Sequence, residues 1–245
     1  MEEGIHISLK AEHVTELFGF PITNTLLMSW LAMAILITIA FFAGRTLSKL
    51  PGRFQIFFEW LIGALLTYLV ETLENKRLAR TLLPFILTLF LFILAGNWLG
   101  LLPGVGSILV HSEGHAVSLF HPMATDLNVT LALSIIVFVA IEVLGARAVG
   151  VFTYASKFFN FHSLVGFFVG IIELLSEFAR LVSFSFRLFG NMFAGKTLIL
   201  VAMFFVPLLL PVPLMLYEVL VGFVQAAIFA MLTLFFVKIA VAQPH

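Results

Sequence analysis

The sequence predicts an all-α integral membrane protein with about five to six membrane helices. Hydrophobic residues make up 62% of the 245 residues and charged residues only 11%, and the mean hydropathy is +1.15. Several apolar runs approach the ~20 residues that span a bilayer. The predicted helices include an amphipathic helix in the membrane plane and a C-terminal hairpin of two long, strongly tilted helices. No repeat or linker divides the sequence, so we expect a single membrane domain over residues 1–245.

The overall charge and the absence of cysteine exclude several classes of function. Lysine plus arginine number 13, as do aspartate plus glutamate, so the net charge gives no reason to expect a nucleic-acid partner. The chain has no cysteine, which excludes disulfide bonds, thiolate metal sites and cysteine nucleophiles. Residues 1–20 are acidic and polar, unlike a signal peptide, so we expect an external lead-in before a retained membrane helix.

The first membrane helix is predicted over residues 26–44. Pro21, Thr23 and Asn24 form a typical helix start, and the apolar run after them contains no charged residue. The segment 53–75 differs, because basic residues flank it on both sides and Glu59 interrupts it. Basic residues favour the cytoplasmic side, so a segment with two basic ends is expected to lie in the membrane plane rather than to cross.

Two further membrane helices are predicted over residues 81–102 and 127–145. Residues 81–146 contain no lysine or arginine, so the loop 103–126 between these helices is expected on the external side. Its glycines and Pro122 favour irregular structure. The distribution of basic residues therefore predicts an external N-terminus and a cytoplasmic C-terminus.

The C-terminal part, residues 164–238, is predicted to form a helical hairpin. Residues 164–206 contain no proline, and one helix of that length would be about 64 Å long, twice the ~30 Å of a bilayer core. This helix is therefore either strongly tilted or broken near Gly190, Asn191 or Gly195. Prolines at 207, 211 and 213 mark a turn, and a final helix is expected over residues 214–237.

A polar stripe runs along the first helix of this hairpin. On a helical wheel at about 100° per residue, six polar residues fall on one face, and the positions between them are mostly apolar. They are Glu173, Ser176, Arg180, Ser183, Arg187 and Asn191. Charges at membrane depth are costly and usually mark an ion path. The alternative is that the stripe packs against polar groups of neighbouring helices.

A second polar site is predicted on the opposite side of the same helix. Lys196 lies about 180° from Arg187 on the wheel. In the final helix, Glu218 and Gln225 are seven residues apart and share one face. In an antiparallel hairpin they could meet Lys196 or Arg187. Such contacts would belong either to an ion path or to a buried Lys–Glu pair that serves only packing.

The segments SFRLFGNMFAGK at 185–196 and EVLVGFVQAAIFAMLT at 218–233 resemble the C-terminal hairpin of subunit a of rotary F-type ATP synthases. The shared features are an Arg-Leu-Phe-Gly-Asn core, a polar residue nine positions after the arginine, and Gln-Ala-x-Ile-Phe in the last helix. The segments 82–104 and 124–133 resemble earlier helices of that family. The resemblance covers essentially the whole chain except the N-terminus and the outer loop.

The resemblance implies a non-catalytic stator subunit of the membrane sector, CF(0). Such a subunit offers two offset half-channels to a rotating c-ring and so couples proton transport to ATP synthesis. Arg187 matches the essential arginine that faces the carboxylates of the c-ring. The residues that match the external half-channel are Asn191, Lys196, Glu218, Gln225, Asp126 and Asn128. The residues that match the internal half-channel are Glu173, Ser176, Arg180 and Ser183.

The same resemblance implies a set of partners. They are the c-ring, the peripheral-stalk b subunits and the rest of the ATP synthase, and no cofactor or metal is expected. The polar N-terminus, which does not resemble a targeting peptide, favours a bacterial inner membrane. A guanidinium stays protonated in proteins, so Arg187 would attract an ionised ring carboxylate without passing on its own proton. The choice between protons and sodium ions depends chiefly on the ring carboxylate, which another chain carries.

The sequence departs from the family pattern at Lys196, where glutamate or histidine is common. We hypothesise that Glu218 is the titrating relay and that the charge on Lys196 tunes it. Because burial disfavours a charged lysine, Lys196 could also relay protons itself at alkaline pH.

Two other classes of function stay open on the sequence alone. The outer loop offers possible zinc ligands and so a metalloenzyme, although their spacing is not that of a helical zinc hydrolase. These residues are His111, Glu113, His115, His121 and Asp126. The alternatives for these residues are a solvated loop or a collector of protons at the mouth of the channel. A self-contained channel or transporter is the other alternative. Against it, the chain offers no carboxylate-rich segment as a counterpart to Arg187.

Overall fold

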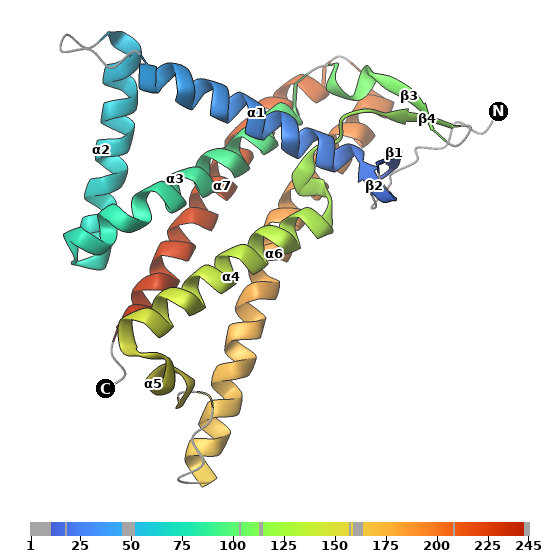
Figure 1. Ribbon diagram of the computed structural model, residues 1–245. Helices are drawn as coiled ribbons and strands as arrows, with labels where there is room; N and C mark the ends of the chain where they lie inside the picture. The colour runs from blue at the N-terminus through green and yellow to red at the C-terminus, as the bar shows by residue number, and fades with distance from the viewer. Residues whose placement is uncertain are drawn as a thin grey trace.

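The computed structural model describes residues 11–17, 19–45, 52–102, 104–112, 115–156, 158, 164–207 and 209–242. Helices dominate this part of the chain (Figure 1). They are α1 (Asn24–Arg45), α2 (Arg53–Leu73), α3 (Lys76–Leu99), α4 (Leu127–Val149), α5 (Val151–Ser156), α6 (Leu164–Phe205) and α7 (Pro211–Val241). In α1, α2, α3, α4 and α7 the apolar stretch is long enough to cross a membrane. The predicted all-α integral membrane fold is thereby confirmed.

Helix α6 is one continuous helix of 42 residues, Leu164–Phe205. At about 1.5 Å per residue it is some 63 Å long, so it exceeds a bilayer core of ~30 Å unless it is strongly tilted. Of the two alternatives left by the sequence, the unbroken helix is the one observed, because neither Gly190 nor Gly195 interrupts it. Helix α7 begins at Pro211, six residues after the end of α6, so the predicted C-terminal pair of long helices is present.

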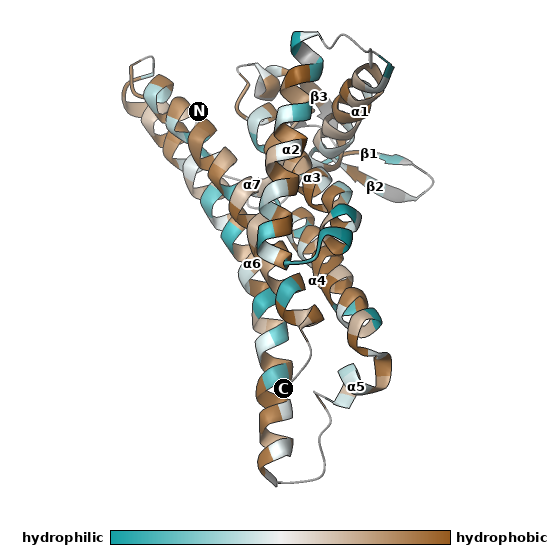
Figure 2. Cartoon of the chain, turned by 90° about the vertical axis from the view of Figure 1, so that its left-hand side faces the viewer, coloured by the Kyte–Doolittle hydropathy of each residue, from teal (hydrophilic) through white to brown (hydrophobic). Residues whose placement is uncertain are grey.

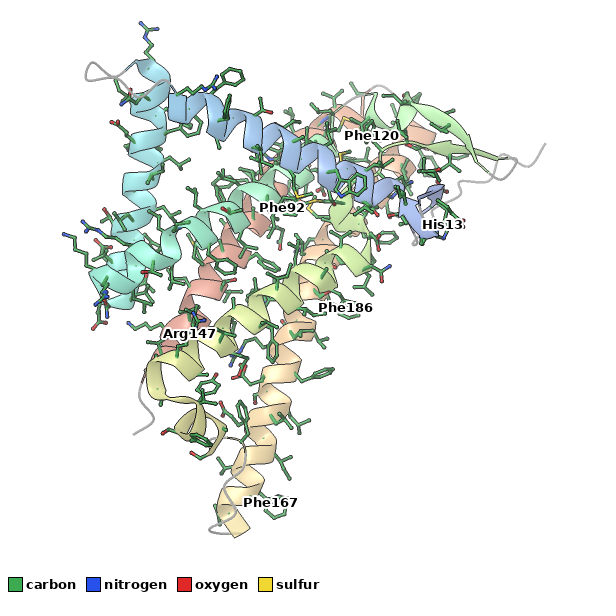
Figure 3. All side chains as sticks on the ribbon, viewed as in Figure 1. His13, Phe92, Phe120, Arg147, Phe167 and Phe186 are labelled. Atoms are coloured by element: carbon green, nitrogen blue, oxygen red, sulfur yellow. The ribbon has the colours of Figure 1, made fainter. Side chains whose placement is uncertain are left out.

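The hydrophobic core lies where α3, α4, α6 and α7 pack together. Phe184 of α6 meets Phe229 of α7 edge to face, with ring centroids 4.8 Å apart. Between α4 and α6, the buried hydroxyls of Thr130 and Ser185 share a hydrogen bond of 3.1 Å. Such pairs satisfy polar groups inside an apolar bundle and hold its helices in register. On the outside of α6, Phe167 and Phe186 project away from the bundle (Figure 3).

Two short β-hairpins cover one end of the bundle, where the sequence led us to expect a polar lead-in and an irregular loop. The strands β1 (His13–Leu17) and β2 (Phe20–Thr23) are antiparallel, as are β3 (Leu109–Ser112) and β4 (His115–Ser118). An isolated hairpin is only marginally stable, and here β1 lies against β3 (Figure 1). Pairing between separate segments cannot be read from the local glycine content, so the expectation of irregular structure was wrong for Leu109–Ser112 and His115–Ser118.

Helix α2 packs along α3, and its C-terminal end is tied to α7 by an ion pair of 2.9 Å between Glu74 and Lys238. Its residues 55–73 are apolar and long enough to cross a membrane as well as to lie in it. The placement of the segment 53–75 in the membrane plane therefore stays a prediction, as do the external N-terminus and the cytoplasmic C-terminus. The first residues of the predicted lead-in lie outside the described residues.

Asp126 fixes the start of helix α4. Its carboxylate accepts hydrogen bonds from the backbone N–H of Asn128 at 2.9 Å and from the Thr25 hydroxyl of α1 at 2.8 Å. The first bond caps the helix N-terminus, and the second joins α4 to α1 across 101 residues of sequence. Asp126 is buried, so both bonds are shielded from water.

Replacing Asp126 with alanine is expected to destabilise the chain by about 2 kcal/mol, because a helix cap is lost and the Thr25 hydroxyl loses its acceptor. Thermal unfolding of the detergent-purified complex measures the change. The matched control is Asp126→Asn, whose amide oxygen keeps an acceptor but cannot carry a proton. An unchanged melting temperature in Asp126→Ala would contradict the capping role.

Candidate functional site

The C-terminal half of the polar stripe, from Ser183 to Asn191, lies on a face of α6 that the described part of the chain leaves uncovered. Ser183, Arg187 and Asn191 are exposed, whereas Phe184 and Leu188 face the core. Hydrophilic positions recur along this otherwise hydrophobic helix (Figure 2). The Arg187 guanidinium donates a hydrogen bond of 3.2 Å to the Ser183 hydroxyl, and within the described ranges it forms no ion pair. The counter-ion that a membrane arginine needs is therefore not supplied by this part of the chain.

Towards the N-terminal half of α6, Arg180 pairs with Glu177 rather than with Glu173. The Nη1 atom of Arg180 lies 2.7 Å from Oε2 of Glu177, which is only 3% exposed. The Arg180 guanidinium also sits over the Phe236 ring of α7, 4.0 Å from its centroid. The sequence analysis assigned Arg180 to the polar stripe, whereas the structure packs it against buried Glu177 and the Phe236 ring of α7. Glu177 was not among the predicted site residues. The spacing of three residues, typical of helical ion pairs, was the signal that could have identified Glu177.

Helix α5 closes the same end of the bundle with Tyr154. Burial raises the pKa of the Tyr154 hydroxyl, and the nearby carboxylates Glu142 and Glu177 raise this pKa further. The Tyr154 ring lies so close to Gly145 that a Cβ atom there would be 2.6 Å from it. Glycine at 145 thus lets α5 fold back against α4 and bring a phenol beside two carboxylates.

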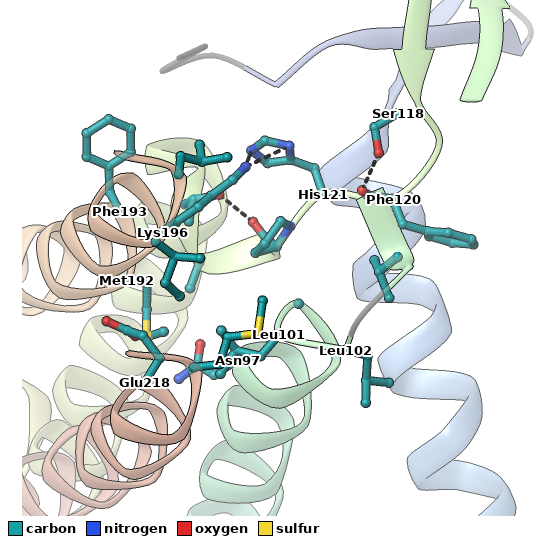
Figure 4. A pocket seen from close by; sticks show the side chains of 18 of the residues that line it. Asn97, Leu101, Leu102, Ser118, Phe120, His121, Met192, Phe193, Lys196 and Glu218 are labelled. Atoms are coloured by element: carbon teal, nitrogen blue, oxygen red, sulfur yellow. Dashed lines mark hydrogen bonds between the residues drawn. The ribbon is translucent and has the colours of Figure 1, made fainter. Parts of the chain in front are cut away.

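A cavity of about 570 Å³ lies beside α6, away from the exposed face of Arg187 (Figure 4). It is enclosed by the outer loop between α3 and α4, the end of α3 and the α6–α7 hairpin. Lys196 and Glu218, both predicted site residues, line it. Asn97 and Glu12, which were not predicted, line it too, as does His121 of the outer loop. Four predicted external residues, Asp126, Asn128, Asn191 and Gln225, are not among its lining residues. Of the six residues predicted for the external half-channel, only Lys196 and Glu218 therefore line this cavity.

Glu218 is buried against the backbone of α6. A Cβ atom at Gly195 would overlap its carboxylate, so this close approach of α7 to α6 requires glycine at 195. Among the described residues, the Glu218 Oε2 atom has no hydrogen-bond partner. The amide nitrogen of the neighbouring Asn97 donates a hydrogen bond of 3.1 Å to the Gly222 carbonyl. The Oδ1 atom of Asn97 has no hydrogen-bond partner among the described residues either. Both orphaned oxygens belong to side chains that line the cavity, where water could satisfy them.

Lys196 does not form the expected contact with Glu218. Its Nζ atom lies 2.6 Å from Nε2 and 3.1 Å from Nδ1 of His121, which the outer loop contributes. Burial lowers the pKa of His121 to about 4, and the positive charge of Lys196 adds to this effect. The imidazole is therefore neutral near pH 7 and accepts a hydrogen bond from the lysine. The sequence offered His121 as a possible zinc ligand, a solvated loop residue or part of a proton collector, but not as a partner of Lys196, because a contact across 75 residues leaves no local pattern.

The remaining predicted residues have more ordinary surroundings. Asn191 is exposed on α6, one turn beyond Arg187, and the side chain of Asn128 is exposed at the start of α4. Gln225 is buried in α7 on the same face as Glu218. The described residues contain no group of three or more histidine, aspartate or glutamate side chains that could hold a metal ion. Of the possible zinc ligands, Glu113 lies outside the described residues.

Replacing Gly195 with alanine is expected to push α6 and α7 apart, because the new methyl group occupies the position of the Glu218 carboxylate. A drop of several degrees in the melting temperature of the purified complex is predicted. Gly190→Ala is the matched control, since a Cβ atom at 190 meets nothing within 4 Å in this chain. Equal melting temperatures for the two variants would contradict the close approach at Gly195.

Comparisons with known proteins identify the family of this chain. The family model described as "ATP synthase A chain" matches residues 26–238. The chain is similar to "ATP synthase subunit a" of Geotalea daltonii, with 32% identity over 217 residues that cover 89% of this chain and 87% of the relative. It is also similar to "ATP synthase subunit a" of Mycobacterium bovis, with 34% identity over 236 residues that cover 94% of this chain and 92% of the relative.

The matched region includes all of α2, α3, α4 and α6 and all but the last three residues of α7. It therefore contains Arg187, Lys196 and Glu218. The match extends over most of the chain and is not confined to one short segment. The chain belongs to the ATP synthase A chain family and is a non-catalytic subunit of the membrane sector of that complex.

Proposed function

We propose that this subunit carries protons to and from the carboxylates of a rotating c-ring through two offset half-channels, and so couples proton flow to ATP synthesis. The observation that carries the proposal is Arg187, an exposed arginine on a membrane helix without an ion-pair partner in the described part of the chain. A buried or lipid-exposed arginine without a counter-ion is costly, so the missing anion is expected from a partner. A ring of small subunits, each with one membrane carboxylate, supplies such an anion repeatedly.

The proposed role of Arg187 follows from guanidinium chemistry. Arginine remains protonated under almost any perturbation, so it attracts an ionised ring carboxylate but cannot pass the proton on. Each carboxylate therefore gives up its proton before it passes Arg187. The hydrogen bond to Ser183, one turn away, holds the guanidinium on the exposed face.

The external half-channel is proposed to run through the cavity beside Lys196 and Glu218. Glu218 is the relay in this proposal, because a carboxylate next to a polar cavity can take up and release a proton. From there to the ring, Asn191 and Gln225 provide polar groups on α6 and α7 near the level of Arg187. Asp126 and Asn128 are proposed to act at the outer end, where Asp126 also has the structural role described above.

The internal half-channel is proposed to lead along the N-terminal half of α6. Glu173, Ser176 and Ser183 offer polar groups on the stripe, and Arg180 is held beside it by Glu177. Lys196 is nine residues beyond Arg187, about 13 Å along the helix axis, whereas Glu173 is fourteen residues before it. The two polar routes thus approach Arg187 from opposite ends and from different sides of one helix.

The partners in this proposal are the c-ring against α6, the peripheral-stalk b subunits and the remaining ATP synthase. The location is the inner membrane of a bacterium, with the N-terminus outside and the C-terminus in the cytoplasm. Bacterial relatives, and five helices in the described part of the chain that are suited to crossing a membrane, support the membrane location. The orientation rests on the distribution of basic residues alone.

Replacing Arg187 with alanine in the assembled complex is expected to reduce proton-driven ATP synthesis in vesicles about a hundredfold or more, because a fixed charge at the transfer point is lost. The matched control is Arg147→Ala, which removes an exposed arginine from the end of α4. Substantial synthesis in Arg187→Ala would refute the central role of this residue.

Replacing Glu218 with glutamine is expected to lower passive proton conduction through the membrane sector about tenfold or more, since the amide occupies the same space without a titratable proton. Conduction is measured in vesicles after removal of the catalytic sector. The control Glu74→Gln changes an exposed carboxylate that pairs with Lys238, and it should conduct normally. Equal conduction in both variants would exclude Glu218 as the relay.

A further inference from the structure

We propose that His121 is a positioning residue that holds the Lys196 ammonium group away from Glu218, so that Glu218 stays free to exchange protons. The inference rests on the proposed function of Glu218 as the external relay. His121 lies in the loop before α4 and Lys196 lies in α6, so only the folded chain brings these two residues into contact.

The geometry separates the two charged groups within one cavity. Lys196 Nζ contacts the His121 ring at 2.6 Å, while Glu218 lies at another part of the cavity beside Asn97 (Figure 4). No ion pair joins Lys196 and Glu218 in the described part of the chain. The His121 pKa of about 4 keeps the imidazole neutral, so it accepts a hydrogen bond instead of repelling the ammonium.

Without His121, the lysine has the length to reach Glu218. The Glu218 carboxylate lies directly against Gly195, the residue before Lys196. Adjacent Cα atoms are about 3.8 Å apart, and the four methylene groups of lysine extend over a longer distance than that. The length of the lysine side chain therefore does not by itself keep the ammonium group from Glu218, and the contact with His121 fixes where that group lies.

A freed Lys196 would choose between the two carboxylates that line the cavity, Glu12 and Glu218. Glu12 is exposed, so water screens its charge, whereas Glu218 is 3% exposed. An opposite charge within about 4–6 Å favours the ionised carboxylate more strongly when both groups are shielded from water. The expected consequence is a Lys196–Glu218 ion pair that holds Glu218 ionised and slows proton uptake.

The test measures ATP synthesis in vesicles as a function of the pH on the external side. His121→Ala should synthesise about tenfold more slowly at neutral external pH, with the optimum moved about one unit to lower pH, because one pH unit is a tenfold change in proton occupancy. His121→Gln keeps an acceptor oxygen and should remain within about twofold of the parent protein. The control His13→Ala removes an exposed histidine of β1 and should leave the rate and the pH profile unchanged.

The decisive comparison is the double variant His121→Ala with Lys196→Gln. Removing the lysine charge should restore most of the synthesis that His121→Ala loses, since glutamine cannot form the ion pair with Glu218. A double variant as slow as His121→Ala, or a His121→Ala profile equal to that of the parent, would overturn the proposal. Assembly is checked by the melting temperature, and His121→Met replaces His121→Ala by the same criteria if the alanine variant does not assemble.

The experiment also separates this inference from the function on which it rests. If Arg187→Ala and Glu218→Gln abolish transport while the His121 variants behave like the parent protein, only the role of His121 fails. If Glu218→Gln still transports protons, the external relay fails and the proposed role of His121 fails with it. If His121→Ala is slow and Lys196→Gln restores the rate, both the relay and its positioning residue are supported.

Discussion

The unmatched positive charge of Arg187 is the constraint on which the arrangement of this chain depends. A guanidinium in a membrane costs several kcal/mol unless an anion or water compensates for it, and the described residues around Arg187 offer it only the Ser183 hydroxyl. The two faces of α6 differ accordingly. Its buried face of Phe184, Leu188 and Met192 packs on α7 and α4, which leaves the opposite face open for a partner. The helix bundle thus acts as a support that presents one charge at a fixed position.

A second constraint is the close approach of α6 and α7 at Gly195. Because a side chain is absent there, Glu218 lies against the α6 backbone instead of pointing to lipid. The loop and α3 then enclose the cavity that Glu218 shares with Asn97, Lys196 and His121. In the proposed function, proton access therefore depends on the same contact as helix packing.

The sequence predicted the parts of this arrangement that depend on local periodicity and failed where distant segments meet. The spacing from Glu173 to Asn191 predicted the polar face of α6, and the prolines predicted the hairpin, because helical geometry relates sequence position to direction. The pairing of Lys196 with His121 could not be predicted, since the two residues are brought together only by the folded loop. Asp126 is an intermediate case. Its position directly before an apolar helix is a capping signal that could have predicted its structural role.

The central claim is that the Ser183–Arg187–Asn191 face of α6 meets the ring, and cysteine cross-linking tests it most directly. The chain contains no cysteine, so each introduced thiol reports on one position only. Cysteine is placed at Ser183 or Asn191, and separately at the buried Ser185, together with a cysteine near the carboxylate of the ring subunit. The account predicts disulfide cross-links to the ring from positions 183 and 191 and none from position 185. Cross-links from position 185 alone, or from none of the three, would contradict it.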